Sequence, residues 1–142
     1  MLDLHLHNLI QIAGLLHLSL LLAGASAAHV LQWRTELYKL STLSRQMIWV
    51  HGIFIVLTIL GFAAVSLTQS HALAAGTTIA RCVTGFIAFF WTARLFIQFF
   101  VFDAREFLTT PWRKLGYHAL TVVFTYFAVI YTYAAVHGMG GA

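Results

Sequence analysis

The sequence predicts an all-α membrane protein, an integral bundle of four transmembrane helices. Of its 142 residues, 61% are hydrophobic and 8% are Asp, Glu, Lys or Arg, and the mean hydropathy is +0.86. A soluble domain of this size would need a more polar surface. The apolar residues also gather into four stretches, each near the roughly 20 residues that cross the hydrocarbon of a bilayer. We expect one domain, residues 1–142, because so short a chain leaves no room for a second one.

The four spans follow one another with short loops between them. The segment before the first span carries Asp3 and no Lys or Arg, which argues against a cleaved secretory signal and for a retained helix. Short loops make consecutive helices antiparallel neighbours, so the bundle should run up-down-up-down with its second and fourth spans parallel. The predicted spans are residues 9–31, 47–67, 78–101 and 115–136.

Basic residues gather in two loops on one side of the chain. By the positive-inside rule these loops face the cytoplasm, so both termini lie outside. We therefore expect a multi-pass protein of the plasma membrane, the inner membrane in a bacterium, surrounded by lipid. Nucleic acid is not an expected partner, because no basic tract lies in a soluble region. The basic loop residues are Arg34, Lys39, Arg45, Arg105, Arg113 and Lys114.

Two histidines near the predicted cytoplasmic face carry the main functional hypothesis. His51 and His118 each lie about one turn inside a span, and the two spans are parallel, so the imidazoles should share one depth. Thr58 continues the polar stripe of His51, while Thr121 and Thr125 continue that of His118. Lipid offers no partners, so both stripes should point into the bundle. Two imidazoles on facing helices can ligate a b-type haem, although they could also simply bond to neighbouring helices.

Cations near the same level would bind the propionates of such a haem. The candidates are Arg94, Arg105, Arg113 and Lys114. Arg94 stands about two turns inside its span, with Gln98 one turn further on nearly the same face. A charge at that depth is costly. Arg94 could instead extend to the headgroups, pair with an acidic group, or bind an anionic lipid or a quinone carbonyl.

A histidine-ligated metal ion is the alternative cofactor, and no cofactor at all is the third possibility. His29 ends the first span at a similar depth, so His29, His51 and His118 could form a cluster. With a carboxylate such as Asp103 they could hold zinc, copper or iron. His29 could equally be interfacial. The single cysteine, Cys82, excludes a cysteine cage.

The first span holds one further polar residue and a pair of small ones. His17 lies near the middle of the span with no other histidine at its level. We interpret it as a hydrogen-bonded packing residue; a proton relay, a quinone hydrogen-bond donor and a second haem ligand are the alternatives. Gly24 and Ala28, four residues apart, are the best pair for close approach of another helix.

Two classes of function follow. The first is a small subunit of a redox complex, an electron-transfer anchor that binds b-type haem or interacts with quinone. The second is a non-redox accessory subunit that packs against other membrane proteins or further copies of itself. A small transporter is a third reading. No catalytic motif such as HExxH, a glycine-rich phosphate loop or a serine elbow occurs, so an independent enzyme is not expected.

Overall fold

The computed structural model describes residues 2–105 and 108–138 of the chain, with side chains from residue 5 onward. Every regular element in these residues is a helix, which confirms the all-α prediction. The helices are α1 (Leu2–Val30), α2 (Trp33–Tyr38), α3 (Thr42–Thr68), α4 (Ser70–Ala74), α5 (Thr78–Phe100) and α6 (Pro111–His137).

Among the described residues, α1, α3, α5 and α6 are long and apolar enough to cross a membrane. The mean hydropathy of their most apolar windows ranges from 1.5 to 2.3. The chain is therefore a multi-pass membrane protein with the four spans that the sequence predicts.

Two helices begin a few residues before the apolar spans that the sequence predicts. The side chain of Ser41 accepts a hydrogen bond from the backbone N–H of Ser44, so α3 begins at Thr42 rather than at residue 47. Pro111 occupies the first turn of α6, which starts there rather than at residue 115. Both helices thus begin in polar sequence ahead of the apolar stretch, where hydropathy gives no signal.

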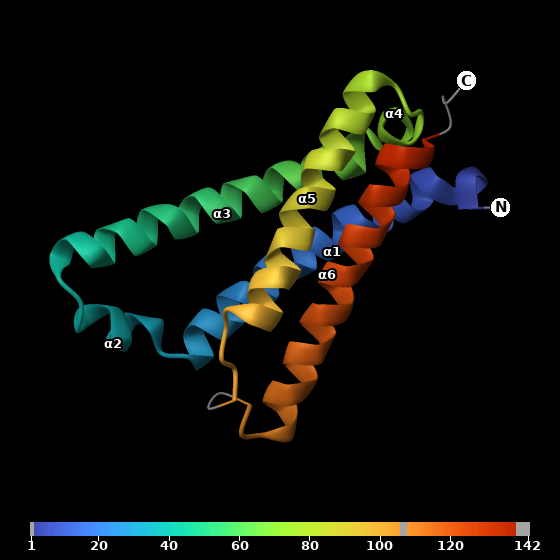
Figure 1. Cartoon of the computed structure of the whole chain (residues 1–142). Coiled ribbons are helices and arrows are strands. Elements are labelled where there is room, and N and C mark those ends of the chain that lie inside the picture. Colours follow the sequence, from blue (N-terminus) through green and yellow to red (C-terminus); the bar gives the residue numbers. More distant parts are fainter. Residues whose placement is uncertain (1, 106–107, 139–142) are drawn as a thin grey trace.

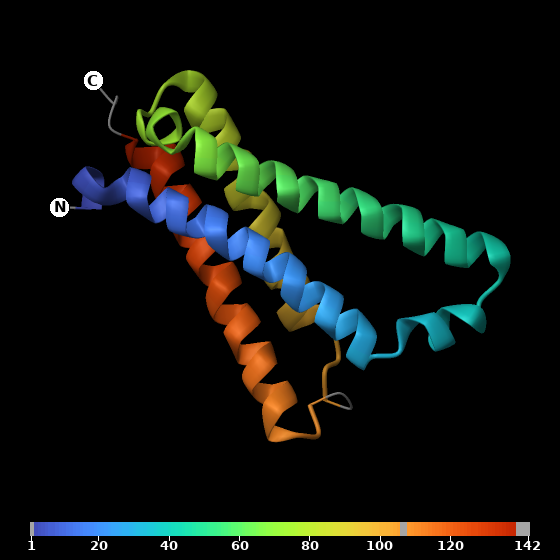
Figure 2. The same ribbon diagram turned by 180° about the vertical axis from the view of Figure 1, so that it is seen from behind.

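The helices pack tightly at the end of the molecule that carries both termini (Figures 1 and 2). There α5 packs along α6, and α1 packs against α3, α4 and α6. Gly14 makes the contact between α1 and α3 possible, because an added Cβ would lie 2.7 Å from Cγ of Leu67. We call this part the closed half (residues 5–21, 59–75, 78–91 and 124–138).

At the other end two helices leave the bundle. Both views show α3 diverging from α5 and α6 (Figures 1 and 2). We call the diverging segments the arms: residues 22–30 of α1 with residue 31 that follows it, and residues 42–58 of α3. No residue of either arm, all of which the structure describes, is buried.

The four-helix bundle predicted from the sequence is present, and two of its helices diverge in this half. The connection between the arms is not a simple loop, because it contains α2. A helix of 6 residues is about 9 Å long, and it runs between the ends of the two arms (Figure 2).

Candidate functional site

His17 of α1 lies at the centre of the closed half and is fully buried. Its Nδ1 lies 2.6 Å from the carbonyl oxygen of Ala13, one turn earlier. Its Nε2 lies 3.1 Å from Nε1 of Trp91 on α5. An indole N–H can only donate, so Nε2 must accept and Nδ1 must carry the proton. The environment thus fixes His17 as one neutral tautomer.

Aromatic rings from three other helices surround this imidazole. The ring of Phe127 on α6 stacks on it at a centroid distance of 4.0 Å and an interplanar angle of 17°. Phe62 of α3 and Tyr131 of α6 present edges to it at 5.9 and 6.0 Å. These contacts fill the space around the ring with apolar surface.

Two more hydrogen bonds, one buried and one partly buried, tie the same helices together. Ser66 Oγ of α3 and the hydroxyl of Tyr131 lie 2.6 Å apart. The hydroxyl of Tyr126 donates to the carbonyl oxygen of Leu9 on α1 at 2.9 Å. The centre of the closed half is therefore a packed polar network that links all four spans.

His17 is buried and hydrogen-bonded, which agrees with its interpretation as a packing residue. Both of its ring nitrogens have partners, so neither is free to ligate a metal.

Its partner Trp91 was missed by sequence reasoning. The signal was present: Trp33, Trp49 and Trp112 lie near span ends, whereas Trp91 lies inside a span, where its N–H needs an acceptor.

A second group of polar side chains lies between α5 and α6, nearer the end of the molecule at which the arms diverge. The amide nitrogen of Gln98 donates to Oγ1 of Thr121 at 2.6 Å. Thr121 in turn donates to the carbonyl oxygen of Tyr117 on its own helix. Arg94, one turn before Gln98, is half-buried against the rings of Phe102 and Phe124. Thr121 thus faces its neighbouring helix, as predicted.

The structure does not bring His51 and His118 together. Both side chains are exposed. His51 Nδ1 lies 2.7 Å from the carbonyl oxygen of Met47, on its own helix, and the ring of His118 contacts that of Tyr117. His51 belongs to the α3 arm, and both views show this arm diverging from the start of α6, which carries His118 (Figures 1 and 2).

Two threonines of these stripes also form hydrogen bonds within their own helices. Thr58 donates to the carbonyl oxygen of Phe54, and Thr125 donates to that of Thr121, in both cases within one helix. Thr125 and His118 are exposed, so the expectation that the α6 stripe faces the bundle holds for Thr121 alone. The physical reason is that a carbonyl four residues earlier satisfies a hydroxyl or an imidazole without burial.

The proposed metal cluster does not form in this structure. His29 is exposed at the end of its helix, on the α1 arm. Among the residues described, no three His, Cys, Asp or Glu side chains gather closely enough to hold a metal ion. Arg105 and Lys114 are exposed and Arg113 is half-buried, all on the α5–α6 side of the molecule.

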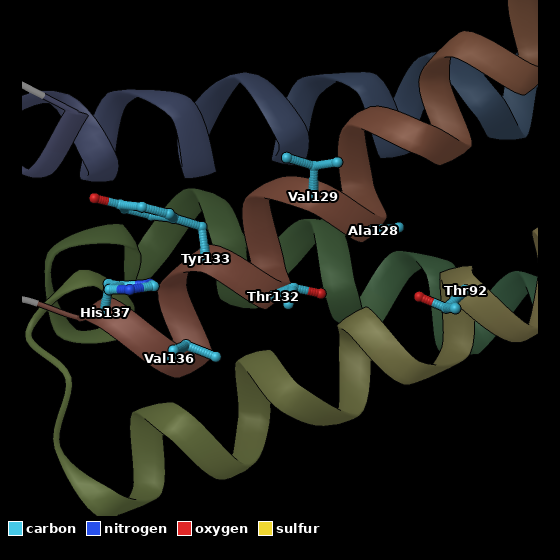
Figure 3. Close-up of a pocket in the computed structure, with 7 residues that line it drawn as sticks. All are labelled: Thr92, Ala128, Val129, Thr132, Tyr133, Val136 and His137. Atoms are coloured by element: carbon cyan, nitrogen blue, oxygen red, sulfur yellow. The ribbon is translucent and has the colours of Figure 1, made fainter.

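A shallow groove of about 420 Å³ runs between α5 and α6 at the end with the termini. Figure 3 shows the rings of Tyr133 and His137 side by side along it, and they stack at a centroid distance of 4.9 Å. Apolar atoms dominate the lining, and none of the predicted site residues contributes to it. It offers a surface for lipid or a helix rather than for a polar substrate.

Comparison with models of protein families, with curated proteins and with solved structures finds no match for this chain.

Proposed function

We propose that this protein is an accessory subunit of a larger membrane complex and that its arms pack against transmembrane helices of a partner. The observation that carries this proposal is the contrast in burial along α1 and α3. Both helices contribute to the core of the closed half, yet neither has a buried residue in its arm. Helices in a membrane associate through close packing, and the arms leave two such surfaces unused.

The composition of the α1 arm suits a partner helix. Residues 23–28 read Ala-Gly-Ala-Ser-Ala-Ala, and a Cβ added at Gly24 would meet no atom within 4 Å. Such a run of small side chains lets a second backbone approach closely. The hydroxyl of Ser26 already donates to the carbonyl oxygen of Leu22, so the surface presents no unsatisfied group at this position.

The gap between α3 and α5 offers a second surface. An apolar groove of about 530 Å³ separates these helices where they begin to diverge. Its floor includes Gly61, and Phe86 stands exposed at its edge. A helix lying in this groove would contact Thr58 at the end of the α3 arm and the exposed ring of Phe86. The groove is lined by Thr58, Gly61, Phe62, Val65, Cys82, Val83, Phe86 and Ile87.

Photo-crosslinking in native membranes tests this proposal. A photoreactive phenylalanine at Phe54 on the α3 arm, or at Ala27 on the α1 arm, should form crosslinks to a membrane protein of defined mass. The control is Val122, which is also exposed and lies at a similar distance from the start of its helix. Crosslinks to a second copy of the chain would identify the partner as itself. Crosslinks to lipid alone at all three positions would refute the proposal.

A redox subunit is the second candidate, and one observation favours it. His51 bonds to a backbone carbonyl through Nδ1, and its ring is exposed. A carbonyl that holds Nδ1–H leaves Nε2 as the free lone pair, which is how histidine ligands are usually oriented. A b-type haem would then lie at the interface with a partner, which would supply the facing ligand unless α3 closes toward His118.

The absorption spectrum of the protein, purified gently from its native membrane, tests the redox candidate. Haem ligation by His51 predicts a low-spin reduced-minus-oxidised spectrum that His51→Ala abolishes. His17→Phe should leave that spectrum in place, because both nitrogens of His17 already have partners within the chain. A colourless protein made with ample haem leaves the accessory role as the proposed function.

The proposed location is the bacterial inner membrane, with the basic loops in the cytoplasm.

A further inference from the structure

Arg94 has a buried donor that nothing in the described part of the chain satisfies. Its Nη1 is the one buried side-chain nitrogen or oxygen of the described residues without a hydrogen-bond partner. The guanidinium carbon lies 5.2 Å from the ring centroid of Phe102 and 5.5 Å from that of Phe124. These rings stabilise the positive charge, but they are no substitute for the oxygen acceptors that guanidinium N–H groups prefer. A ligand with such oxygens would complete the site.

The guanidinium extends toward the end of α5 that carries the loop to α6. Arg94 precedes Phe100, the last residue of α5, by six positions, which is about 9 Å of helix. Phe102 follows the helix, and its ring contacts the guanidinium. The side chain of Arg94 is only half-buried. Part of the Arg94 residue is therefore accessible, while Nη1 itself is buried.

No carboxylate in the described residues fills this role. Glu36 pairs with Lys39 at 2.7 Å. Asp103 is exposed and accepts a hydrogen bond from the backbone N–H of Arg105. Asp3 belongs to the opposite end of the chain, and Glu106 lies outside the described residues. The described residues therefore offer Arg94 no carboxylate, and the site can accept an anion from another molecule.

The surroundings favour a phosphate group carried by a lipid. A guanidinium presents a planar fork that matches two phosphate oxygens. The end of the molecule that Arg94 faces also carries the basic loops, and the chain has a net charge of +4. Basic sites between transmembrane helices on the cytoplasmic side are typical of acidic headgroup recognition. The rings of Phe102 and Phe124 provide apolar surface for the lipid beyond its phosphate.

We propose that Arg94 anchors a binding site for the phosphate of an acidic phospholipid, between α5, α6 and the start of their connecting loop. The headgroup oxygens accept hydrogen bonds from the N–H groups of Arg94. The exposed cations Arg105 and Lys114 raise the local concentration of acidic lipid. This site is independent of the partner proposed for the arms, because it lies on the α5–α6 pair.

Thermal unfolding of the delipidated full-length protein in neutral detergent tests the site. Phosphatidylglycerol should raise the midpoint of unfolding of the wild type by on the order of 5 °C. Phosphatidylcholine and inorganic phosphate at equal concentration should have little effect. Arg94→Gln should lose the gain from phosphatidylglycerol, and native mass spectrometry should detect less retained acidic lipid on this variant.

Arg34→Gln is the matched control, since Arg34 is an exposed cation of the other basic connection. Arg34→Gln should show the same increase in unfolding midpoint with phosphatidylglycerol as the wild type. If Arg94→Gln does not fold, Arg94→Met, with an apolar side chain of similar length, carries the same expectation. The proposal is overturned if the Arg94 variants gain as much as the wild type. It is also overturned if phosphatidylcholine or free phosphate reproduces the whole shift, because the source would then not be an acidic lipid.

Discussion

The closed half has side-chain hydrogen bonds between its helices, whereas none is seen in the arms, all of whose residues the structure describes. In the closed half, His17 bonds to Trp91 across helices, and Ser66 does the same with Tyr131. In the arms, the polar side chains that form hydrogen bonds within a span turn back to their own helix, as His51 does to the carbonyl oxygen of Met47. The cross-helix bonds fix which helices pack together, whereas the bonds within one helix fix nothing beyond it.

Because of this difference, a polar residue in a predicted span does not by itself indicate a contact between helices. A histidine or threonine there needs an acceptor or a donor, but the carbonyl four residues earlier is always close. Tryptophan differs, because its indole N–H has no comparable partner on its own helix and requires an acceptor elsewhere. Trp91 is therefore a stronger indicator of buried packing than Thr125, and the predictions below test this contrast from the largest effect to the smallest.

Trp91→Ala should cause the largest loss of stability. The side chain is 1% exposed and contacts His17, Phe124 and Phe127. Truncation of a buried tryptophan costs about 3 to 5 kcal/mol in protein cores, and we expect a loss of this order in an SDS titration followed by circular dichroism. Trp112→Ala, at a position 80% exposed, should change the free energy of unfolding by less than about 0.5 kcal/mol. Equal losses would mean that the core is misplaced.

His17→Phe should be moderately destabilising, whereas His51→Phe should be close to neutral. Phenylalanine keeps the stacking on Phe127 but leaves the N–H of Trp91 buried without an acceptor, which costs about 1 to 3 kcal/mol. At His51 the same change replaces an exposed ring by another. The two variants should be compared in the same titration. A larger loss of stability for His51→Phe than for His17→Phe would contradict the assignment of His17 to the closed half and of His51 to an arm.

Tyr131→Phe should cost about 1 kcal/mol, because it removes the hydroxyl that bonds to Ser66 and leaves the ring in place. Hydrogen bonds between transmembrane helices average about 0.6 kcal/mol, so a small value is expected. Thr125→Val removes a hydroxyl that bonds within its helix and should have a smaller effect still. The double variant with Ser66→Ala should show a coupling energy close to the loss in Tyr131→Phe alone.

The sequence predicts the four spans well, because hydropathy reports transfer into lipid directly. It misses α2 and α4, which have 6 and 5 residues and are too short to show a helical period. It also misses the divergence of α3 from α5 and α6. For the site, depth alone suggested that His51 and His118 could meet, but depth says nothing about lateral distance. For His17, its isolation from other histidines favoured a packing role, and its burial and hydrogen bonds agree with that interpretation.

The central claim is that the arms are a surface for another membrane protein, and one pair of glycines tests it most directly. In the described chain, a Cβ at Gly24 of the α1 arm or at Gly116 of α6 would meet no atom within 4 Å, so leucine fits the isolated protein at either position. Complex size in mild detergent, measured by size-exclusion chromatography with light scattering, should show the wild type and Gly116→Leu in one assembly of high mass. Gly24→Leu should elute as a smaller species, because leucine blocks the close approach of a partner helix. Co-elution of Gly24→Leu with the wild type, or a wild type that is already monomeric, would contradict the account.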